Sequence, residues 1–413
     1  MRIFERYFSK NPVFSLPDFP ETVSLVVVIP IFDDPDIFRT IDSLAACVFP
    51  PGGVGVLMVV NHAENCAPEV KARNMRLFPE IQEHTARFTG AEIHFRTVCA
   101  FDLPLKQSGV GCARKLAMDK AARYFYEKRG GEGILASLDA DTCVEKNYFT
   151  ELRRCFGAKD VAGVTVDYEH TWENTGNPEE IEAICKYELY LRYYRRCLEY
   201  VGHPYAFSCL GSAFAVNVRD YVALGGMNKR QAGEDFYFIQ KLISTGRLTH
   251  LSTTKVYPSA RISERTPFGT GQAVKQILRE KGSWKTYHFG AFRLLKPFFD
   301  SLEELYGAED PKIESFIHKQ PEGLRNFLWD HGMGAVIREV NDNCASLYQF
   351  RKRFFDHFNA FRVLKYLNYV HPVYFEKQDI EEAACCLLNE IGVEGKERRN
   401  ARELLKVFRR KGI

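Results

Sequence analysis

One apolar run near the amino end limits what this chain can fold into more than any other stretch. Residues 25–30 read Leu-Val-Val-Val-Ile-Pro, and an unbroken β-branched run is typical of a strand buried on both faces of a parallel sheet. A second such run covers 54–60, and helical periodicity follows each of them, over 36–46 and 68–87. Strands that alternate with helices imply right-handed crossovers. The sequence therefore predicts an α/β fold with a mostly parallel sheet flanked by helices.

A later strand, predicted over 134–138, ends in two carboxylates one residue apart, Asp139 and Asp141. The carboxyl ends of strands are where open α/β sheets place their ligands. Two acidic side chains crowded there repel each other, so we expect a cation between them. Carboxylate oxygens suit Mg²⁺ or Mn²⁺, and such a metal is typically shared with substrate phosphates. The alternative is a solvated turn after a strand, because Asp-x-Asp is common by chance.

Composition and local patterns exclude several classes of protein. A formal net charge of +3 over 413 residues argues against a dedicated nucleic-acid binder. The longest apolar run, residues 23–32, is about half the length of a membrane span, and the first residues lack the apolar core of a signal peptide. Twelve cysteines without a C-x-x-C pair indicate free thiols in a reducing compartment. We therefore expect a cytosolic protein.

Composition and hydrophobic periodicity divide the chain into three parts. Residues 1–22 are aromatic and interrupted by prolines, which indicates an irregular lead-in. Strand and helix patterns alternate over 23–272, without the G-x-G-x-x-G or Walker A motifs of dinucleotide and P-loop sites. From 273 to 413 every segment has helical period, with prolines as breakers. We expect an α/β catalytic domain over 23–272 and a helical carboxyl-terminal region over 273–413.

Five short motifs occur in a characteristic order. They are Val26-Val27-Val28-Ile29-Pro30, Gly111-Cys112-Ala113-Arg114-Lys115, Leu138-Asp139-Ala140-Asp141, Gly225-Gly226-Met227 and Gly233-Glu234-Asp235. Together they resemble the GT-A glycosyltransferases, and more closely the family 2 group of nucleotide-sugar transferases. The resemblance covers residues 23–272 and does not extend into the helical tail. It implies a GT-A fold and transfer of a sugar from a UDP- or GDP-sugar donor to an acceptor hydroxyl on a saccharide, lipid or metabolite.

The resemblance implies a metal site at the Asp-x-Asp pair. In the family the second Asp usually binds the metal and the first lies near the ribose, which assigns Asp141 to Mn²⁺ or Mg²⁺ and Asp139 to the ribose or a metal-bound water. Such a metal stabilises the charge that grows on the leaving phosphate. Relatives often complete the site with a later histidine, but the loop over 260–265 contains none. The third ligand therefore stays open, with Glu264 as a conceivable substitute.

The same resemblance implies a nucleoside site where the first two strands end. Pro30, Phe32 and Asp33 end the first strand, where the family holds the nucleoside. Asn61 ends the second strand, where relatives usually carry an Asp that bonds the base. An Asn side chain offers both a donor and an acceptor, so base recognition remains chemically open to it. Plain core packing is an equal alternative for Phe32.

Cations for a donor diphosphate are predicted at two places. Arg114 and Lys115 begin a helix after two glycines, and a helix amino end with fixed cations favours a diphosphate. A surface cation pair is the alternative. The polar loop over 261–272 adds Arg265, and such a loop can close over the donor or grip an anionic acceptor. A solvated connector is the alternative for this loop.

Asp235 is the candidate catalytic base. It follows Glu234 at the amino end of an apolar helix. In inverting relatives this Asp takes a proton from the acceptor hydroxyl, and the helix dipole helps to keep the carboxylate ionised. The alternative is an N-cap, a role that Asp fills routinely and that is compatible with catalysis.

Two other functions stay open. A retaining transferase that acts on a small anionic acceptor would suit the arginine loop, and a non-catalytic scaffold would use the helical tail to bind a partner. Cations mix with apolar residues at helical spacing over 351–355 and 396–411. Such helices either make peripheral contact with anionic lipid or have one solvated and one packed face.

Overall fold

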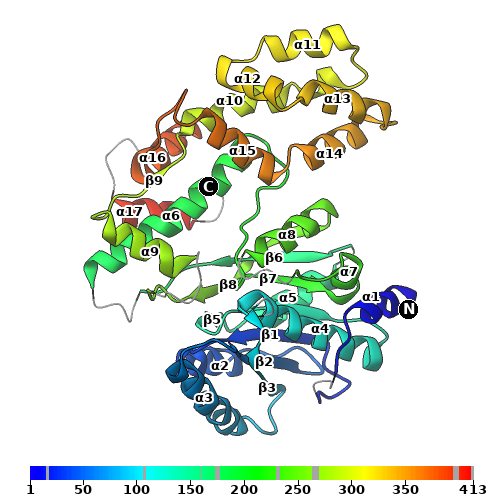
Figure 1. Cartoon of the computed structure of the whole chain (residues 1–413), viewed down its shortest axis with the longest axis vertical. Coiled ribbons are helices and arrows are strands. Elements are labelled where there is room, and N and C mark those ends of the chain that lie inside the picture. Colours follow the sequence, from blue (N-terminus) through cyan, green and yellow to red (C-terminus); the bar gives the residue numbers. More distant parts are fainter. Residues whose placement is uncertain are drawn as a thin grey trace. The chain divides into compact units, whose positions relative to one another are not determined.

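The described part of the chain forms two compact units. One contains Met1–Gly176 and Cys209–Ala273, and the other contains Asn177–Ser208 and Val274–Ile413. Figure 1 shows the elements of both units. This computed structural model describes residues 1–14, 18–105, 108–158, 160–172, 177–228, 233–262, 269–393 and 400–410.

The first unit is built on one sheet, whose strands are β1 (Leu25–Ile31), β2 (Val54–Ala63), β3 (Ile93–Leu103), β4 (Ile134–Ser137), β5 (Thr142–Val144), β6 (Gly163–Tyr168), β7 (Phe214–Asn217) and β8 (Leu248–Pro258). Within the described ranges the order of the eight strands is β3-β2-β1-β4-β7-β6-β8-β5. β1 runs parallel to β2 and β4, β2 to β3, and β6 to β8. β7 is antiparallel to β4 and β6, and β5 to β8. The predicted mostly parallel α/β sheet is confirmed.

The strand order reverses between β1 and β4. The chain passes outward from β1 to β2 and β3, and then returns to place β4 on the other side of β1. Ligands of open α/β sheets bind at the carboxyl ends of the strands at such a reversal. Every residue of β1 and β2 is buried, which explains their unbroken apolar runs.

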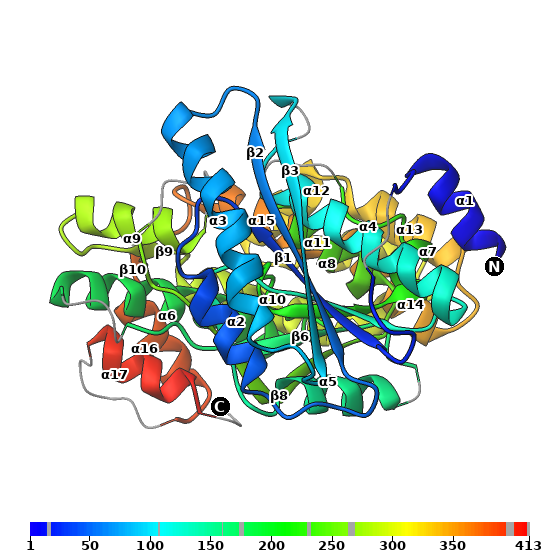
Figure 2. The same ribbon diagram turned by 90° about the horizontal axis from the view of Figure 1, so that it is seen from below.

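Seven helices of the described residues belong to this unit: α1 (Arg2–Lys10), α2 (Ile37–Ala45), α3 (Pro68–Ala86), α4 (Val110–Arg129), α5 (Tyr148–Gly157), α7 (Val218–Ala223) and α8 (Glu234–Ser244). α4 packs on β1 and β2, while α3 packs on β2 and β3. Figure 2 shows α2 and α3 lying next to each other beside these strands. The sheet is therefore flanked by helices, as the alternating pattern predicts.

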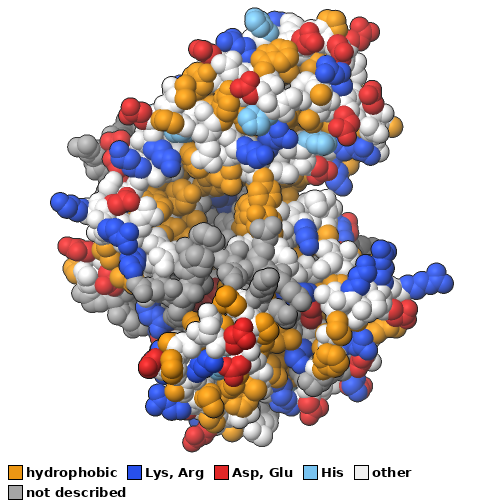
Figure 3. All heavy atoms as spheres, viewed as in Figure 1, with side chains coloured by type: hydrophobic (Ala, Val, Ile, Leu, Met, Phe, Trp, Pro, Cys, Tyr) orange, Lys and Arg blue, Asp and Glu red, His pale blue; other side chains and the backbone are white. Residues whose placement is uncertain are grey.

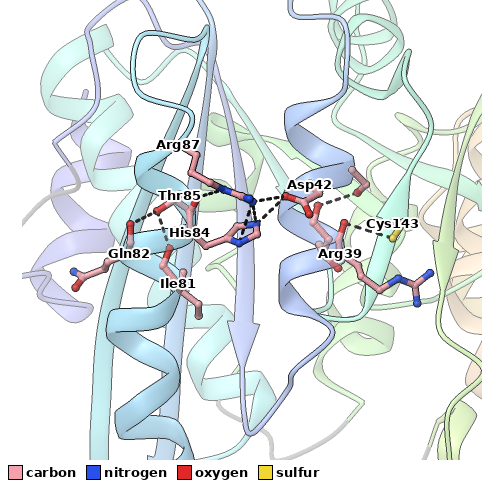
Figure 4. Close-up of polar contacts among 10 residues, drawn as sticks. Arg39, Asp42, Ile81, Gln82, His84, Thr85, Arg87 and Cys143 are labelled. Carbon is pink, nitrogen blue, oxygen red and sulfur yellow. Dashed lines mark hydrogen bonds and ion pairs between the residues drawn. The ribbon is translucent and has the colours of Figure 1, made fainter.

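Polar contacts fix α2 against α3 and against the turn after β4. Figure 4 shows Asp42 on α2 facing His84 on α3 and Arg87 directly after that helix. The Asp42 Oδ1 lies 2.7 Å from His84 Nε2 and 3.2 Å from Arg87 Nη2. On the same helix, the Thr40 hydroxyl donates to the Ala140 carbonyl at 2.9 Å. Since Ala140 lies between the two aspartates of the Asp-x-Asp pair, α2 holds that turn in place.

The prediction of an irregular lead-in over 1–22 is wrong for its first half, because Arg2–Lys10 form helix α1. The physical reason is that Phe4, Tyr7 and Phe8 recur at helical spacing and are buried. A Cβ atom on Gly131 would lie only 2.5 Å from the Phe4 ring, so glycine at that position admits the ring. The prolines of this segment come after the helix has ended.

The second unit is helical: α6 (Pro178–Tyr200), most of α9 (Thr270–Arg279), α10 (Phe289–Asp300), α11 (Asp310–His318), α12 (Glu322–Asp330), α13 (Met333–Asp342), α14 (Leu347–His357), α15 (Ala360–Val370), α16 (Ile380–Glu390) and α17 (Ala401–Phe408), with a short 3₁₀ turn at Leu302–Leu305 and the small strands β9 (Lys285–Thr286) and β10 (Gln378–Asp379). α6 lies inside the sequence range 23–272 but packs on α16 and α17. Its buried Glu188 accepts from Arg409, directly after α17, at 2.6 Å. This long-range ion pair explains why α6 belongs with the helical unit.

The tail helices bury their apolar faces inside the second unit. Phe350, Phe354 and Phe355 of α14 are buried, as are Leu404 and Leu405 of α17. The reading with one solvated and one packed face therefore holds for these helices, and a lipid contact through their apolar faces is not proposed. On the face in Figure 3, Lys and Arg side chains alternate with Asp and Glu and form no single block. No helix in the described ranges has the length and apolar character to cross a membrane.

Candidate functional site

Arg114 is the centre of a buried network at the carboxyl end of β4. Its Nη2 donates to Asp139 Oδ1 at 2.8 Å, and its Nε donates to Glu234 Oε1 at 3.1 Å. Its Nη1 donates to the Ser137 hydroxyl at 2.6 Å and to the Gly211 carbonyl at 3.1 Å. The side chain is 3% exposed. All three guanidinium nitrogens are therefore engaged within the protein.

The charge of Arg114 is balanced by carboxylates on two elements. Burial lowers the pKa of Arg114, but Asp139 and Glu234 outweigh it and hold this pKa above its ordinary range. Glu234 is itself buried, so a pairing cation is required there. Within the fold, its guanidinium braces β4 against the start of α8, and the predicted diphosphate role of Arg114 stays a prediction.

Gly211 brings the network together with Asp235. A Cβ atom at this glycine would lie 2.8 Å from Arg114 Nη2 and 3.2 Å from Asp235 Oδ2. Any larger residue would therefore displace the guanidinium or the carboxylate. The close approach also shows that Asp235 lies beside Arg114, which connects the start of α8 to the end of β4.

Asp235 is half-buried and has a perturbed pKa. α8 begins at Glu234 with Gly233 as its N-cap at φ +71°, and Asp235 Oδ1 accepts from the Phe236 N–H at 2.7 Å. Burial and the neighbouring Glu234 raise the pKa of Asp235 to about 6, against the opposing effect of Arg114. Because the N-cap is Gly233, the N-cap alternative for Asp235 does not hold.

A second guanidinium lies at the same edge of the sheet. Arg261 follows β8, and its Nη2 donates to Asp34 Oδ1 at 2.8 Å while its Nη1 lies 3.2 Å from Asp36 Oδ2. The pairing of Thr142 with Pro258 puts the end of β8 next to the Asp-x-Asp turn. Burial lowers the pKa of Arg261, but Asp34, Asp36 and Asp141 together raise it.

The residues predicted to hold the nucleoside are partly used within the fold. The Asn61 amide donates to the Ile31 carbonyl at 2.9 Å and ties β2 to β1. Asp33, at φ +49°, accepts from Arg73 Nε at 2.7 Å and from its Nη2 at 2.6 Å. Pro30 lies inside β1 and pairs with Val59, so it does not end the strand. Phe32, at the end of β1, is half-buried.

Lys115 lies in a cluster of its own, and its predicted role at the diphosphate stays a prediction. Its Nζ donates to Asp119 Oδ2 at 2.8 Å and to the Tyr7 hydroxyl at 3.0 Å, in a buried cluster with Tyr221. The structure therefore does not bring Lys115 together with the Asp139 network. Consecutive helical residues point about 100° apart, so Arg114 and Lys115 serve different places.

The donor set at the strand ends fits a metal that is shared with a substrate. Among the residues that the structure describes, no three His, Cys, Asp or Glu side chains come together as a metal-binding group. Mg²⁺ usually keeps several waters and takes one or two carboxylates plus substrate phosphates, which Asp139 and Asp141 can supply. His250 lies within β8 and bonds the Thr165 hydroxyl at 3.1 Å. Two predicted residues, Glu264 and Arg265, lie outside the described residues.

Sequence reasoning missed several members of this site. The sequence patterns indicate no role for Asp34, Asp36 or Glu234, and they place Arg261 only in a polar loop. The sequence signal for the first two is the run of aspartates after the first strand, at positions 33, 34 and 36. No local signal pairs them with Arg261, because that contact spans 227 positions of sequence.

Comparison with solved structures finds similar chains in complex with nucleotide sugars. Residues 1–349 of TarS from S. aureus, in complex with UDP-GlcNAc, are 12% identical, with 81% of this chain and 91% of that chain covered and a TM-score of 0.41. The mannosyltransferase PcManGT from Pyrobaculum calidifontis, in complex with GDP-Man and Mn²⁺, is 12% identical, with 86% and 93% covered and a TM-score of 0.39. No protein-family model matches this chain, and no curated protein matches its sequence. At these identities and TM-scores, similarity alone assigns neither a family nor an activity.

Proposed function

We propose that this chain is a GT-A-type glycosyltransferase that moves a sugar from a UDP- or GDP-sugar to an acceptor hydroxyl, with inversion and with a divalent metal. One observation carries the proposal. A single buried guanidinium, Arg114, joins Asp139 at the carboxyl end of β4 to the start of α8, where the pKa of Asp235 is raised to about 6. Inverting sugar transfer needs a base that is ionised near neutral pH, and it needs carboxylates at the strand ends to hold the metal. Asp235 and Asp139 lie close enough to Arg114 to serve these two roles.

Asp235 is the proposed base. Above pH 6 its carboxylate is mostly ionised and can accept the proton of an acceptor hydroxyl. The hydroxyl oxygen then forms a bond to the anomeric carbon as the bond from that carbon to the diphosphate oxygen breaks. The proton goes to Asp235, and the electron pair leaves with the nucleoside diphosphate. Because the acceptor attacks opposite the leaving group, the configuration of the anomeric carbon inverts.

Asp139 and Asp141 are the proposed protein ligands of Mn²⁺ or Mg²⁺. A bound divalent cation would stabilise the charge on the leaving diphosphate as a Lewis acid. Arg114 holds the Asp139 carboxylate in place, and the Thr40 hydroxyl holds the turn between the two aspartates. These contacts support a site in which the Asp139 carboxylate and the backbone of the turn are in place before the donor binds.

A retaining reaction on a small anionic acceptor receives less support. In that alternative the arginines after β8 would grip the acceptor. Arg261 instead pairs with Asp34 and Asp36. The configuration of the product's anomeric carbon, read by NMR, separates the two reactions.

A donor-hydrolysis screen tests the proposed function. UDP- and GDP-sugars are incubated with the full chain, with and without Mn²⁺, and release of the nucleoside diphosphate is measured. We expect metal-dependent release from at least one donor and its loss in Asp141→Ala. A rate that is equal in Asp141→Ala and the natural chain would remove the metal assignment.

A further inference from the structure

The pairing of Arg261 has a consequence for the metal site. Asp34 is nearly buried, with a side chain that is 6% exposed, and its Oδ1 accepts both from Arg261 Nη2 at 2.8 Å and from the Asp36 N–H at 3.1 Å. Arg261 also contacts the Asp36 carboxylate, at 3.2 Å. One guanidinium therefore pairs with two aspartates that follow β1 and offsets part of their charge.

The same guanidinium lies near the Asp-x-Asp turn that follows β4. Pro258, the last residue of β8, pairs with Thr142, the residue directly after Asp141. Arg261 is three residues beyond that pair, and the Asp141 carboxylate contributes to the raised pKa of Arg261. Strands β1 and β4 are parallel neighbours, so their carboxyl ends share this edge of the sheet. The chain thus supplies its own cation at the place where the metal is proposed.

The Arg261 guanidinium and a divalent cation at the Asp-x-Asp turn would repel each other. A positive unit charge and a divalent cation several ångströms apart repel each other by more than RT, even at an effective dielectric constant of about 20. A metal that binds at Asp141 must therefore either displace the Arg261 side chain or bind with lower affinity because of its positive charge. This penalty exists before any nucleotide is present.

We propose that the charge of Arg261 competes with the divalent cation at this edge of the sheet, so that the metal-free chain already carries a cation beside the Asp-x-Asp turn. This inference rests on the proposed metal site at Asp139 and Asp141. It assigns Arg261 a role as a positioning residue that sets metal affinity.

Calorimetric titration of the full chain with MnCl₂ alone, without nucleotide, tests the competition. We expect Arg261→Met to bind Mn²⁺ about tenfold more tightly than the natural chain, or more, because a repelling unit charge is gone. Arg261→Gln keeps a hydrogen-bond donor for Asp34 and serves if the Met variant does not fold. It should show the same direction of change.

Arg247→Met is the matched control. Arg247 precedes the other end of β8, is 33% exposed like Arg261, and likewise pairs with two aspartates, Asp220 and Asp160. Its variant should bind Mn²⁺ with the affinity of the natural chain. Equal affinity of the Arg261 variants and the natural chain would overturn the inference, and so would an equal gain in the control.

Failure of this inference and failure of the proposed function are distinguishable. If none of the chains binds Mn²⁺ without nucleotide, competition by Arg261 is rejected. The donor-hydrolysis screen then decides the sugar-transfer proposal separately, because it measures release of the nucleoside diphosphate with the donor present.

Discussion

At the residue scale, one arginine determines whether the site forms. Arg114 is engaged through every guanidinium nitrogen and pairs with both Asp139 and the buried Glu234. Removing one partner of a buried ion pair leaves an uncompensated charge, which is far more costly than losing an exposed pair. The site is thus a charge-balanced network, and its members cannot be changed independently.

We predict that Arg114→Met lowers the free energy of unfolding by about 3–5 kcal/mol, because Glu234 and Asp139 lose their cation. Urea unfolding followed by circular dichroism measures the change. Arg154→Met is the control, since Arg154 pairs with Glu151 at 2.6 Å on the surface of α5. It should cost no more than about 1 kcal/mol. Equal costs for the two variants would contradict the buried brace.

A second prediction concerns the pH dependence of activity. Burial and Glu234 raise the pKa of Asp235 to about 6, so kcat/KM should rise with pH through about 6 and then level off. Asp235→Asn should lower kcat by about 10²- to 10⁴-fold at pH 8 without loss of the folded state. A variant that keeps its activity would remove the base assignment.

The same residue predicts a change in stability. The folded-state pKa of Asp235 lies above the unfolded value, so ionisation disfavours the folded state as pH rises through about 6. Asp235→Asn removes this effect and should raise the free energy of unfolding at pH 8 by about 1–3 kcal/mol. At pH 4 the difference should be near zero. A variant less stable than the natural chain at pH 8 would contradict the raised pKa.

The sequence allowed part of this site to be predicted. Asp139, Arg114 and Asp235 were identified, and the structure brings them together in one network. The direction of a side chain was not predictable from position alone. Arg114 turns towards β4, whereas its neighbour Lys115 turns towards Asp119 and Tyr7.

At the scale of elements, the amino-terminal helix is part of the α/β unit. The hydroxyls of Tyr7 on α1 and Tyr221 on α7 both donate to Asp119 on α4 at 2.6 Å. Lys115 completes this buried cluster. The helix was not predicted because three aromatic residues within a short, proline-interrupted segment indicate a helix only when a surface to cover them is known.

Gly226 provides a test of how α1 is docked. This glycine has φ +66°, and a Cβ atom there would lie 2.1 Å from the Tyr7 hydroxyl oxygen. We predict that Gly226→Ala lowers the free energy of unfolding by about 1–3 kcal/mol, from the clash and the strained backbone. Thermal or urea unfolding measures the change.

A double-mutant cycle with Tyr7→Phe separates the two causes. Removing the hydroxyl relieves part of the clash, so the double variant should be more stable than the sum of the two single effects predicts. Strict additivity would show that Tyr7 does not contact Gly226 as described.

At the scale of the whole molecule, the chain combines an α/β unit with a helical unit. The alternation of patterns predicted the sheet correctly, because buried parallel strands have an unmistakable apolar signature. The assignment of α6 to the helical unit depends on its packing with α16 and α17 and on the pairing of Glu188 with Arg409. Contacts across such sequence distances leave no local pattern.

The cysteines offer a prediction for the folded chain as a whole. None of the twelve cysteines, all of which the structure describes, forms a disulfide. We predict that thiol titration of the denatured protein without reductant gives twelve reactive groups, and that a reductant leaves the melting temperature unchanged. A lower count, or a melting temperature that falls with reductant, would indicate a disulfide.

The most direct measurement is calorimetric titration with UDP- and GDP-sugars in the presence of Mn²⁺. The account predicts that at least one donor gives a binding isotherm, that Asp141→Ala abolishes it, and that Arg247→Met preserves it. Absence of heat with every donor would contradict a nucleotide-sugar site and would favour a non-catalytic scaffold.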